Sequence, residues 1–121
     1  MPPKKERLSH REFEQYFSAG KRYHNEYCTL IYTPAPAFHT AVAVPQKLVK
    51  KAVLRNRLRR QVYNIMQSLE APRAFGGVYI FVLKKPSLEA SFETLQKSIE
   101  ALVEEVHSSS SRRFAEKGSS R

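Results

Sequence analysis

The sequence predicts an α+β fold in which helices pack on one mixed sheet of about four strands. The spacing of the apolar residues changes along the chain, in the order helix, strands, helix, strand, helix. Turn-forming Pro and Gly residues separate these segments. A chain of 121 residues has the length of one domain with a modest core. Together these observations predict an α/β sandwich with three helices.

The first helix is expected to start at Ser9 and to end before Gly20. Ser9 and Glu12 have the spacing of a capping box, in which each side chain accepts a hydrogen bond from the other residue's backbone. Gly20 suits the position after a helix, which often adopts a left-handed conformation. Phe13 and Phe17 are four residues apart and therefore share one face of this helix.

Three strands are expected next. Residues 27–32 and 38–44 alternate in the manner of strands, and a shorter strand is expected over residues 21–24. Because side chains alternate along a strand, Tyr32 should share a face with Cys28.

A long helix is expected from about residue 49 to residue 69. Its apolar residues recur at three- and four-residue steps, so this stripe must face a core. The stripe consists of Leu54, Leu58, Val62, Ile65 and Leu69. At about 100° per residue, the side chains that point away from the stripe are Asn56, Arg57, Arg59 and Arg60, and Arg55 lies at its edge. The helix is thus expected to display cations and to bury leucines.

The last strand and the last helix follow a glycine pair. Gly76 and Gly77 break the chain, and the apolar run 78–83 is typical of an interior strand. The last helix is expected to begin at Pro86. Its apolar face would consist of Leu88, Phe92, Leu95, Ile99, Leu102, Val103 and Val106.

Both ends of the chain are predicted to be disordered. Residues 1–7 and 108–121 are basic and have little apolar surface to bury. A single domain is therefore expected over residues 8–107.

The composition favours a polyanionic partner. The chain has 21 Lys and Arg against 11 acidic residues, and its formal net charge is +10. No apolar run approaches the roughly 20 residues that a membrane span needs, and the N-terminus lacks the apolar core of a secretion signal. The lone Cys28 cannot form an internal disulfide, so a cytoplasmic location is expected.

The most informative segment is residues 47–60. Its cations are Lys47, Lys50, Lys51, Arg55, Arg57, Arg59 and Arg60. No acidic residue occurs between Tyr27 and Leu69. Like charges at this density repel one another unless a polyanion is present, which indicates a nucleic-acid-binding face. The alternative, a solvated charged face, normally mixes both signs of charge.

Candidate catalytic residues are few. The chain has no Asp, its Glu residues lie mainly in terminal helices, and its four His residues have no ligand spacing. A protein-only nuclease would need clustered carboxylates for two metal ions, or His24 and His39 converging on one phosphate. We therefore expect no catalytic residue, no metal site and no small-molecule cofactor in the protein.

Residues 52–60 read Ala-Val-Leu-Arg-Asn-Arg-Leu-Arg-Arg. They resemble the signature of the bacterial ribonuclease P protein subunit, Ala-Val-x-Arg-Asn-Arg-(Ile/Val/Leu)-(Lys/Arg)-Arg. The order and spacing of the other elements agree over roughly residues 7 to 107. Two departures precede the signature. Residues 45–47 read Pro-Gln-Lys where the family usually has Ser-Lys-Lys, and residues 48–51 lack the usual Gly and are one residue longer.

The resemblance implies a non-catalytic subunit of a ribonucleoprotein enzyme. In that family a catalytic RNA uses Mg²⁺ to remove the 5′ leader of precursor tRNA. The protein binds this ribonuclease P RNA and the single-stranded leader, and it binds no cofactor and no membrane by itself. The implied fold is an α/β sandwich of the ribosomal protein S5 domain 2-like class. Its βαβ crossover is left-handed, against the general rule.

The resemblance also assigns residues to two sites. The implied RNA-binding residues are Lys47, Lys50, Lys51, Arg55, Asn56, Arg57, Arg59 and Arg60. Phe13, Phe17 and Tyr32 resemble the residues of a cleft for leader nucleotides, whose bases can stack on aromatic rings. On spacing alone, however, an aromatic pair such as Phe13 and Phe17 is more often core packing. The charge pattern fits equally well a ribosome- or RNA-associated binding module without a processing role.

Overall fold

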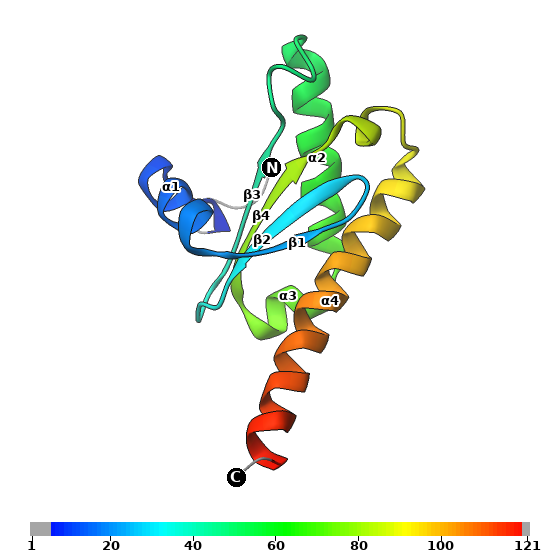
Figure 1. Cartoon of the computed structure of the whole chain (residues 1–121). Helices are drawn as coiled ribbons and strands as arrows, with labels where there is room; N and C mark the ends of the chain where they lie inside the picture. The colour runs from blue at the N-terminus through cyan, green and yellow to red at the C-terminus, as the bar shows by residue number, and fades with distance from the viewer. Residues whose placement is uncertain (1–5, 120–121) are drawn as a thin grey trace.

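A four-stranded mixed sheet forms the centre of the protein (Figure 1). The computed structural model describes residues 6–119, with side chains to residue 108. The strands are β1 (Lys21–His24), β2 (Cys28–Thr33), β3 (Phe38–Ala43) and β4 (Gly77–Leu83), in the spatial order β1-β2-β4-β3. β2 pairs antiparallel with both β1 and β4, whereas β3 and β4 are parallel.

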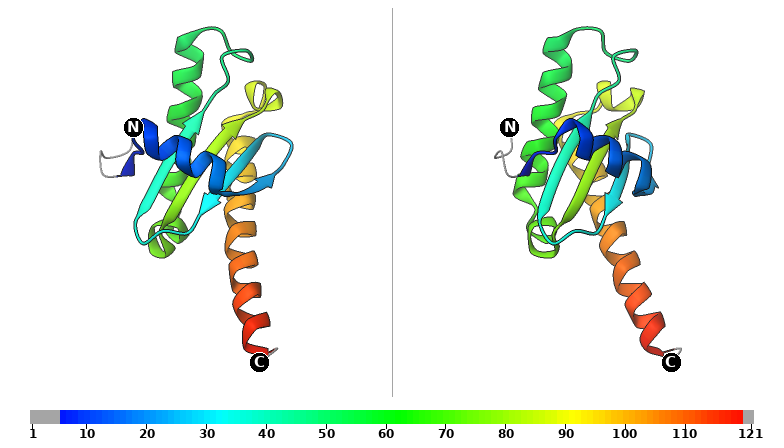
Figure 2. Two further views of the ribbon diagram at one scale, coloured as in Figure 1. Left: turned by 60° about the vertical axis from the view of Figure 1, so that its left-hand side comes forward. Right: turned by 90° about the vertical axis from the view of Figure 1, so that its left-hand side faces the viewer.

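Helices cover both faces of the sheet (Figures 1 and 2). Helix α1 (His10–Ala19) crosses one face, and α2 (Ala52–Ser68) and α4 (Phe92–Ser119) pack on the other. The sandwich predicted from the sequence is therefore confirmed. The short helix α3 (Glu70–Phe75) and the 3-10 helix η2 (Lys85–Leu88) complete the fold, and neither is predicted from the sequence.

The connection from β3 to its parallel neighbour β4 is a βαβ crossover that includes α2 and α3. In the right-hand view of Figure 2, β3 and β4 run upward, β4 lies to the right of β3, and α2 returns behind them. A right-handed crossover would place β4 on the other side of β3. The crossover is therefore left-handed, as the resemblance implies.

The sheet separates a large core from a small one. The large core fills the space between the sheet and helices α2 and α4, and it includes Leu30, Ile65, Phe81 and Ile99, all almost fully buried. The small core lies under α1 and is formed by the buried residues Ile31, Val78 and Ile80, with α1 side chains packed on them. Neighbouring residues of one strand thus serve different cores, because side chains alternate along it.

Helix α2 is longer than the surface on which it packs. It begins at Ala52, and its buried side chains all lie in its second half, from Val62 onward. Leu54 is 44% exposed, although the apolar spacing places it in the buried stripe. That expectation is wrong for Leu54 because the first turns of α2 extend past the end of the sheet (Figure 1).

The last helix also begins later than expected. Residues from Pro86 form η2, and α4 starts at Phe92, after Ser91. The Ser91 hydroxyl accepts a hydrogen bond of 3.1 Å from the backbone N–H of Thr94, so Ser91 acts as the N-cap. Leu88 and Phe92, both predicted on the apolar face of this helix, are consequently exposed.

The predicted disorder of the chain ends falls partly on residues 1–5 and 120–121, which lie outside the described residues, and there it stays a prediction. Glu6, by contrast, is buried, and its carboxylate accepts hydrogen bonds from Arg73 (3.2 Å) and Gln67 (3.0 Å). This partly buried ion pair, together with the Gln67 hydrogen bond, ties the start of the chain to α2 and α3. At the other end, the backbone of α4 remains helical through Ser119 and projects away from the sheet (Figure 2).

The capping box of α1 is confirmed. The backbone of Glu12 donates to the Ser9 hydroxyl (3.2 Å), and the backbone of Ser9 donates to the Glu12 carboxylate (2.9 Å). These hydrogen bonds from Ser9 lower the pKa of Glu12. Gly20 follows the helix with an extended φ of −71°, so its role is not the expected left-handed turn. A Cβ atom there would lie 2.5 Å from Cγ2 of Ile31, which means that glycine is needed for space.

Replacement of Gly20 by Ala should lower the free energy of unfolding by about 1–3 kcal/mol, because the new methyl group overpacks the contact between α1 and the sheet. Urea titration followed by circular dichroism measures this loss. Ser18→Ala, an exposed substitution at the end of the same helix, is the matched control and should change stability by less than about 0.5 kcal/mol. Equal stability of Gly20→Ala and wild type would contradict the close approach.

Candidate nucleic-acid interface

The loop before α2 is held by an arginine of the helix itself. Backbone N–H groups of Leu48 and Val49 donate to the carbonyl of Pro45, which forms a turn. Nη1 of Arg55 then donates to the carbonyls of Val49 and Lys50, both at 2.8 Å. The altered loop that precedes the signature is thus fixed from within the protein. Arg55, predicted only as an RNA contact, also has this structural role.

The remaining predicted RNA-binding residues lie at the surface. The exposed ones are Lys47, Lys50, Lys51, Asn56, Arg57 and Arg60. Arg59 is half-buried and donates a hydrogen bond of 2.9 Å to Oδ1 of Asn56. Asn56, which has poor intrinsic helix propensity, therefore orients a neighbouring guanidinium group.

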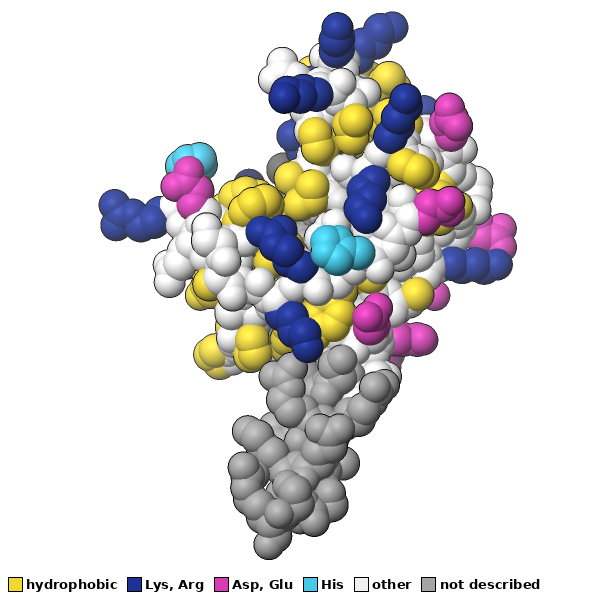
Figure 3. Space-filling view, viewed as in Figure 1, with side chains coloured by type: hydrophobic (Ala, Val, Ile, Leu, Met, Phe, Trp, Pro, Cys, Tyr) yellow, Lys and Arg dark blue, Asp and Glu magenta, His cyan; other side chains and the backbone are white. Residues whose placement is uncertain are grey.

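Opposite charges are separated on the surface. In Figure 3, Lys and Arg side chains gather at the top, over the start of α2, whereas acidic side chains gather on the right, over α4. The ion pairs found in residues 6–108 are His10–Glu14, Glu6–Arg73 and Glu93–Lys97, and none of them involves residues 47–60. The cations of this segment thus have no carboxylate partner in the described part of the chain.

Two arginines act electrostatically on Tyr63 of α2. Burial raises the pKa of Tyr63 on α2, while a hydrogen bond with the backbone of Val42 and the charges of Arg59 and Arg7 oppose this rise. The charge of Arg7 thus acts on the same tyrosine as that of Arg59. Sequence spacing cannot identify Arg7, since about fifty residues separate it from Arg59.

The two phenylalanines of α1 lie over the sheet. Phe13 and Phe17 are half-buried, their ring centroids are 5.6 Å apart, and both rings pack on the small core. The guanidinium of Arg22 lies over the Phe17 ring at 4.9 Å and donates to the Phe17 carbonyl. Core packing thus accounts for one side of these rings, while part of each ring stays accessible.

Tyr32 does not join them. It packs on the large core, where its ring centroid is 5.1 Å from that of Tyr79, on the opposite face of the sheet from α1. The expected grouping of Tyr32 with Phe13 and Phe17 is therefore wrong. Tyr32 lies on the same face of the sheet as Cys28, as the strand alternation predicts. The neighbouring side chain of Ile31 consequently points to the other face, toward α1.

Two polar residues on the α1 face of the sheet each have one buried atom without a hydrogen-bond partner among the described residues. They are Thr33 and His39, which both pair with Val78 across the sheet. The sequence does not single them out for this site, because neither belongs to a motif. His24 lies on β1, the opposite outer strand, and contacts Thr29. His24 and His39 therefore do not converge on one phosphate.

Residues 6–108 contain no group of three His, Cys, Asp or Glu side chains placed to bind a metal ion together. None of the described helices combines the length and the apolar character needed to cross a membrane. Burial raises the pKa of the Cys28 thiol to about 12, which makes it a poor nucleophile.

The fold and this surface define an α+β protein with a cation-rich helix that extends beyond its sheet. The family model described as Ribonuclease P matches residues 1–107. The ribonuclease P protein component of Microcystis aeruginosa is 31% identical over 109 residues, which cover 84% of this chain and 90% of the relative. The chain therefore belongs to the ribonuclease P protein family. It is accordingly a subunit of this ribonucleoprotein endoribonuclease of tRNA processing.

Solved structures agree with this assignment. The ribonuclease P protein from Thermotoga maritima superposes with a TM-score of 0.70 at 26% identity, over 80% of this chain and 94% of that one. The Staphylococcus aureus ribonuclease P protein gives a TM-score of 0.71 at 18% identity, over 84% and 94% of the two chains. At 18% identity, the match to the Staphylococcus aureus protein supports only the fold.

The different roles of two arginines can be separated by stability. Arg55→Ala should lower the free energy of unfolding by about 1–2 kcal/mol, because two backbone carbonyls lose a charged donor. Arg57→Ala, on the exposed face, should change it by less than about 0.5 kcal/mol. Chemical denaturation of both variants measures the difference. Equal losses would show that the Arg55 hydrogen bonds do not hold the loop.

Proposed function

We propose that the chain binds ribonuclease P RNA through the cationic face of α2 and the loop before it, and that it also binds the single-stranded 5′ leader of precursor tRNA. In this proposal the RNA carries out Mg²⁺-dependent removal of the leader, and the protein strengthens substrate binding. The observation that carries the proposal is the exposed, carboxylate-free cation cluster of residues 47–60 on a member of this family.

Phosphate binding follows from the chemistry of these side chains. A guanidinium group keeps its charge at any physiological pH and can donate two parallel hydrogen bonds to one phosphate. Arg57 and Arg60 are exposed and free to do so, and Arg59 is held in orientation by Asn56. The lysines of the loop act as mobile point charges. Such a surface binds phosphates without reading base sequence.

The leader would lie on the α1 side of the sheet. The accessible parts of Phe13 and Phe17 can stack on bases, which is worth about 1–3 kcal/mol per base and tolerates any sequence. Tyr32, on the other face, takes no direct part in this proposal.

The chemistry is assigned to the RNA. We place the Mg²⁺ ions on RNA phosphates, to which hard cations bind through oxygen atoms. The protein lowers the Mg²⁺ requirement because its cations neutralise part of the charge that Mg²⁺ otherwise screens.

Reconstitution with the RNA tests this function. The purified protein alone should leave precursor tRNA intact, and its addition to ribonuclease P RNA should restore leader removal at low Mg²⁺ concentration. Cleavage rates across a Mg²⁺ titration, with and without protein, measure the effect. A ribosome- or RNA-associated module without a processing role would bind RNA yet leave these rates unchanged.

Salt dependence tests the phosphate contacts. The logarithm of the RNA affinity should fall linearly with the logarithm of salt concentration, by roughly 0.7–0.9 per phosphate contact. Arg57→Ala should flatten this slope by about one contact. Lys97→Ala removes the same charge from α4, where Lys97 pairs with Glu93, and should leave the slope unchanged. An unchanged slope for Arg57→Ala would mean that Arg57 does not touch a phosphate.

A further inference from the structure

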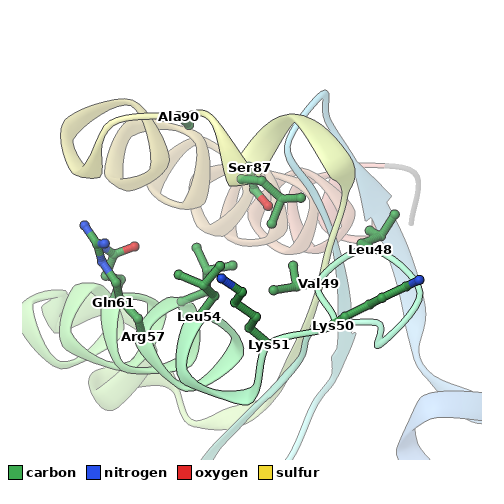
Figure 4. A pocket seen from close by; sticks show the side chains of 11 residues that line it. Leu48, Val49, Lys50, Lys51, Leu54, Arg57, Gln61, Ser87 and Ala90 are labelled. Carbon is green, nitrogen blue, oxygen red and sulfur yellow. The ribbon is translucent and has the colours of Figure 1, made fainter.

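A groove separates the projecting start of α2 from η2. Its volume is about 360 Å³. Leu54 and Leu58 line it from α2, Leu48 from the preceding loop, and Leu88 from η2. Figure 4 shows Arg57 and Gln61 at one end of the groove, and Lys51 across its middle beside Leu54. An apolar floor thus lies between cationic side chains.

Within residues 6–108, no side chain covers the exposed leucines of this groove. Leu48, Leu54 and Leu88 all belong to the exposed large apolar residues, and the groove brings all three together. Burial of apolar surface is favourable by about 25 cal/mol per Å², so each exposed leucine would gain free energy if an occupant covered it. A phosphate backbone alone would cover the cations and leave these leucines exposed. The groove therefore suits an occupant with both an apolar surface and negative charge.

We propose that this groove holds an unpaired nucleotide of ribonuclease P RNA, with its base against the leucines and its phosphate on Lys51 and Arg57. This inference rests on the proposed function. Sequence-specific contacts to RNA usually involve splayed bases of loops and bulges. Leucine is among the apolar residues that proteins insert beside nucleic-acid bases. The amide of Gln61, at the same end as Arg57, can hydrogen-bond with a base edge.

An acidic amphipathic peptide offers the same two properties, but two observations favour the nucleotide. First, Lys50, Lys51 and Arg57 belong both to the groove and to the cation cluster, so bound RNA would pass directly over the opening. Second, a volume of about 360 Å³ lies near the lower limit of small-molecule sites, whereas a docked helix needs room for anchors over several turns.

The two kinds of contact respond differently to salt. Phosphate contacts release counterions, and they therefore set the slope of affinity against salt concentration. Burial of a base against leucine releases no counterions, so it raises affinity without changing that slope. Loss of the leucines and loss of the arginine are therefore distinguishable in one titration.

Binding of ribonuclease P RNA by the double variant Leu54→Ala/Leu88→Ala tests the inference. We expect about tenfold weaker binding at every salt concentration, with the same slope as wild type. Both leucines are partly exposed, and Ala favours helix, so thermal melting should show an intact fold. Val53→Ala is the matched control, because Val53 is 75% exposed on the same helix and does not line the groove. It should bind like wild type.

The possible failures are separable. If the wild-type protein does not bind the RNA, the proposed function fails. If the wild type binds and the double variant binds equally well, only the nucleotide groove is overturned, and the acidic peptide becomes the better occupant. If the double variant flattened the slope of RNA affinity against salt concentration as Arg57→Ala does, the inference would also be overturned. The leucines would then act through phosphate contacts.

Crosslinking supplies a second, independent readout. Ala90 lines the groove, so a photoreactive thiol reagent on Ala90→Cys would report on its contents. The native Cys28 is fully buried and stays unlabelled in the folded protein. We expect a crosslink to an unpaired nucleotide of ribonuclease P RNA, and weaker crosslinking when Leu54→Ala is added. Absence of a crosslink, or crosslinks only to base-paired nucleotides, would overturn the inference.

Discussion

The parallel pairing of β3 with β4 is the constraint on which the rest of the structure depends. Because the two strands run in the same direction, the chain must return along the whole sheet before it can begin β4. Helix α2 makes this return, and the loop before it carries the chain past the end of the sheet. The second half of α2 therefore packs on the core, while its first half lies in solvent. One helix thus serves as a core element and as a charged surface.

The sheet also works as a partition. Side-chain alternation in β2 sends Leu30 into the large core and Ile31 under α1, so each face has its own apolar cluster. The face under α1 is only partly covered, which leaves aromatic rings of α1 half-exposed. The opposite face is sealed by two helices, and its aromatic residues, such as Tyr79, serve packing.

Much of this architecture could be predicted from the sequence, because periodicity and capping are local properties. The capping box at Ser9, the strands and the cationic helix all follow from neighbouring residues. The site was harder to predict, since it depends on where elements end relative to one another. Leu54 has perfect helical spacing, yet no sheet lies beneath it. Arg55 looks like its neighbours, but a loop conformation that spacing cannot reveal gives it internal acceptors. Strand alternation predicts the face of Tyr32, whereas its separation from Phe13 depends on which face of the sheet α1 covers.

The start of α2 has one further consequence. A helix N-terminus carries a partial positive charge, which acidic residues or an N-cap side chain normally offset. Here Lys51 occupies the N-cap without a side-chain hydrogen bond, no acidic residue lies in the first turn, and Arg55 adds another positive charge. The macrodipole and the side chains therefore repel each other in the free protein. An anion bound at this end relieves that repulsion, so winding of the first turn and anion binding are thermodynamically linked. An anion at this end of α2 is therefore expected to add to the hold that Arg55 already has on the preceding loop.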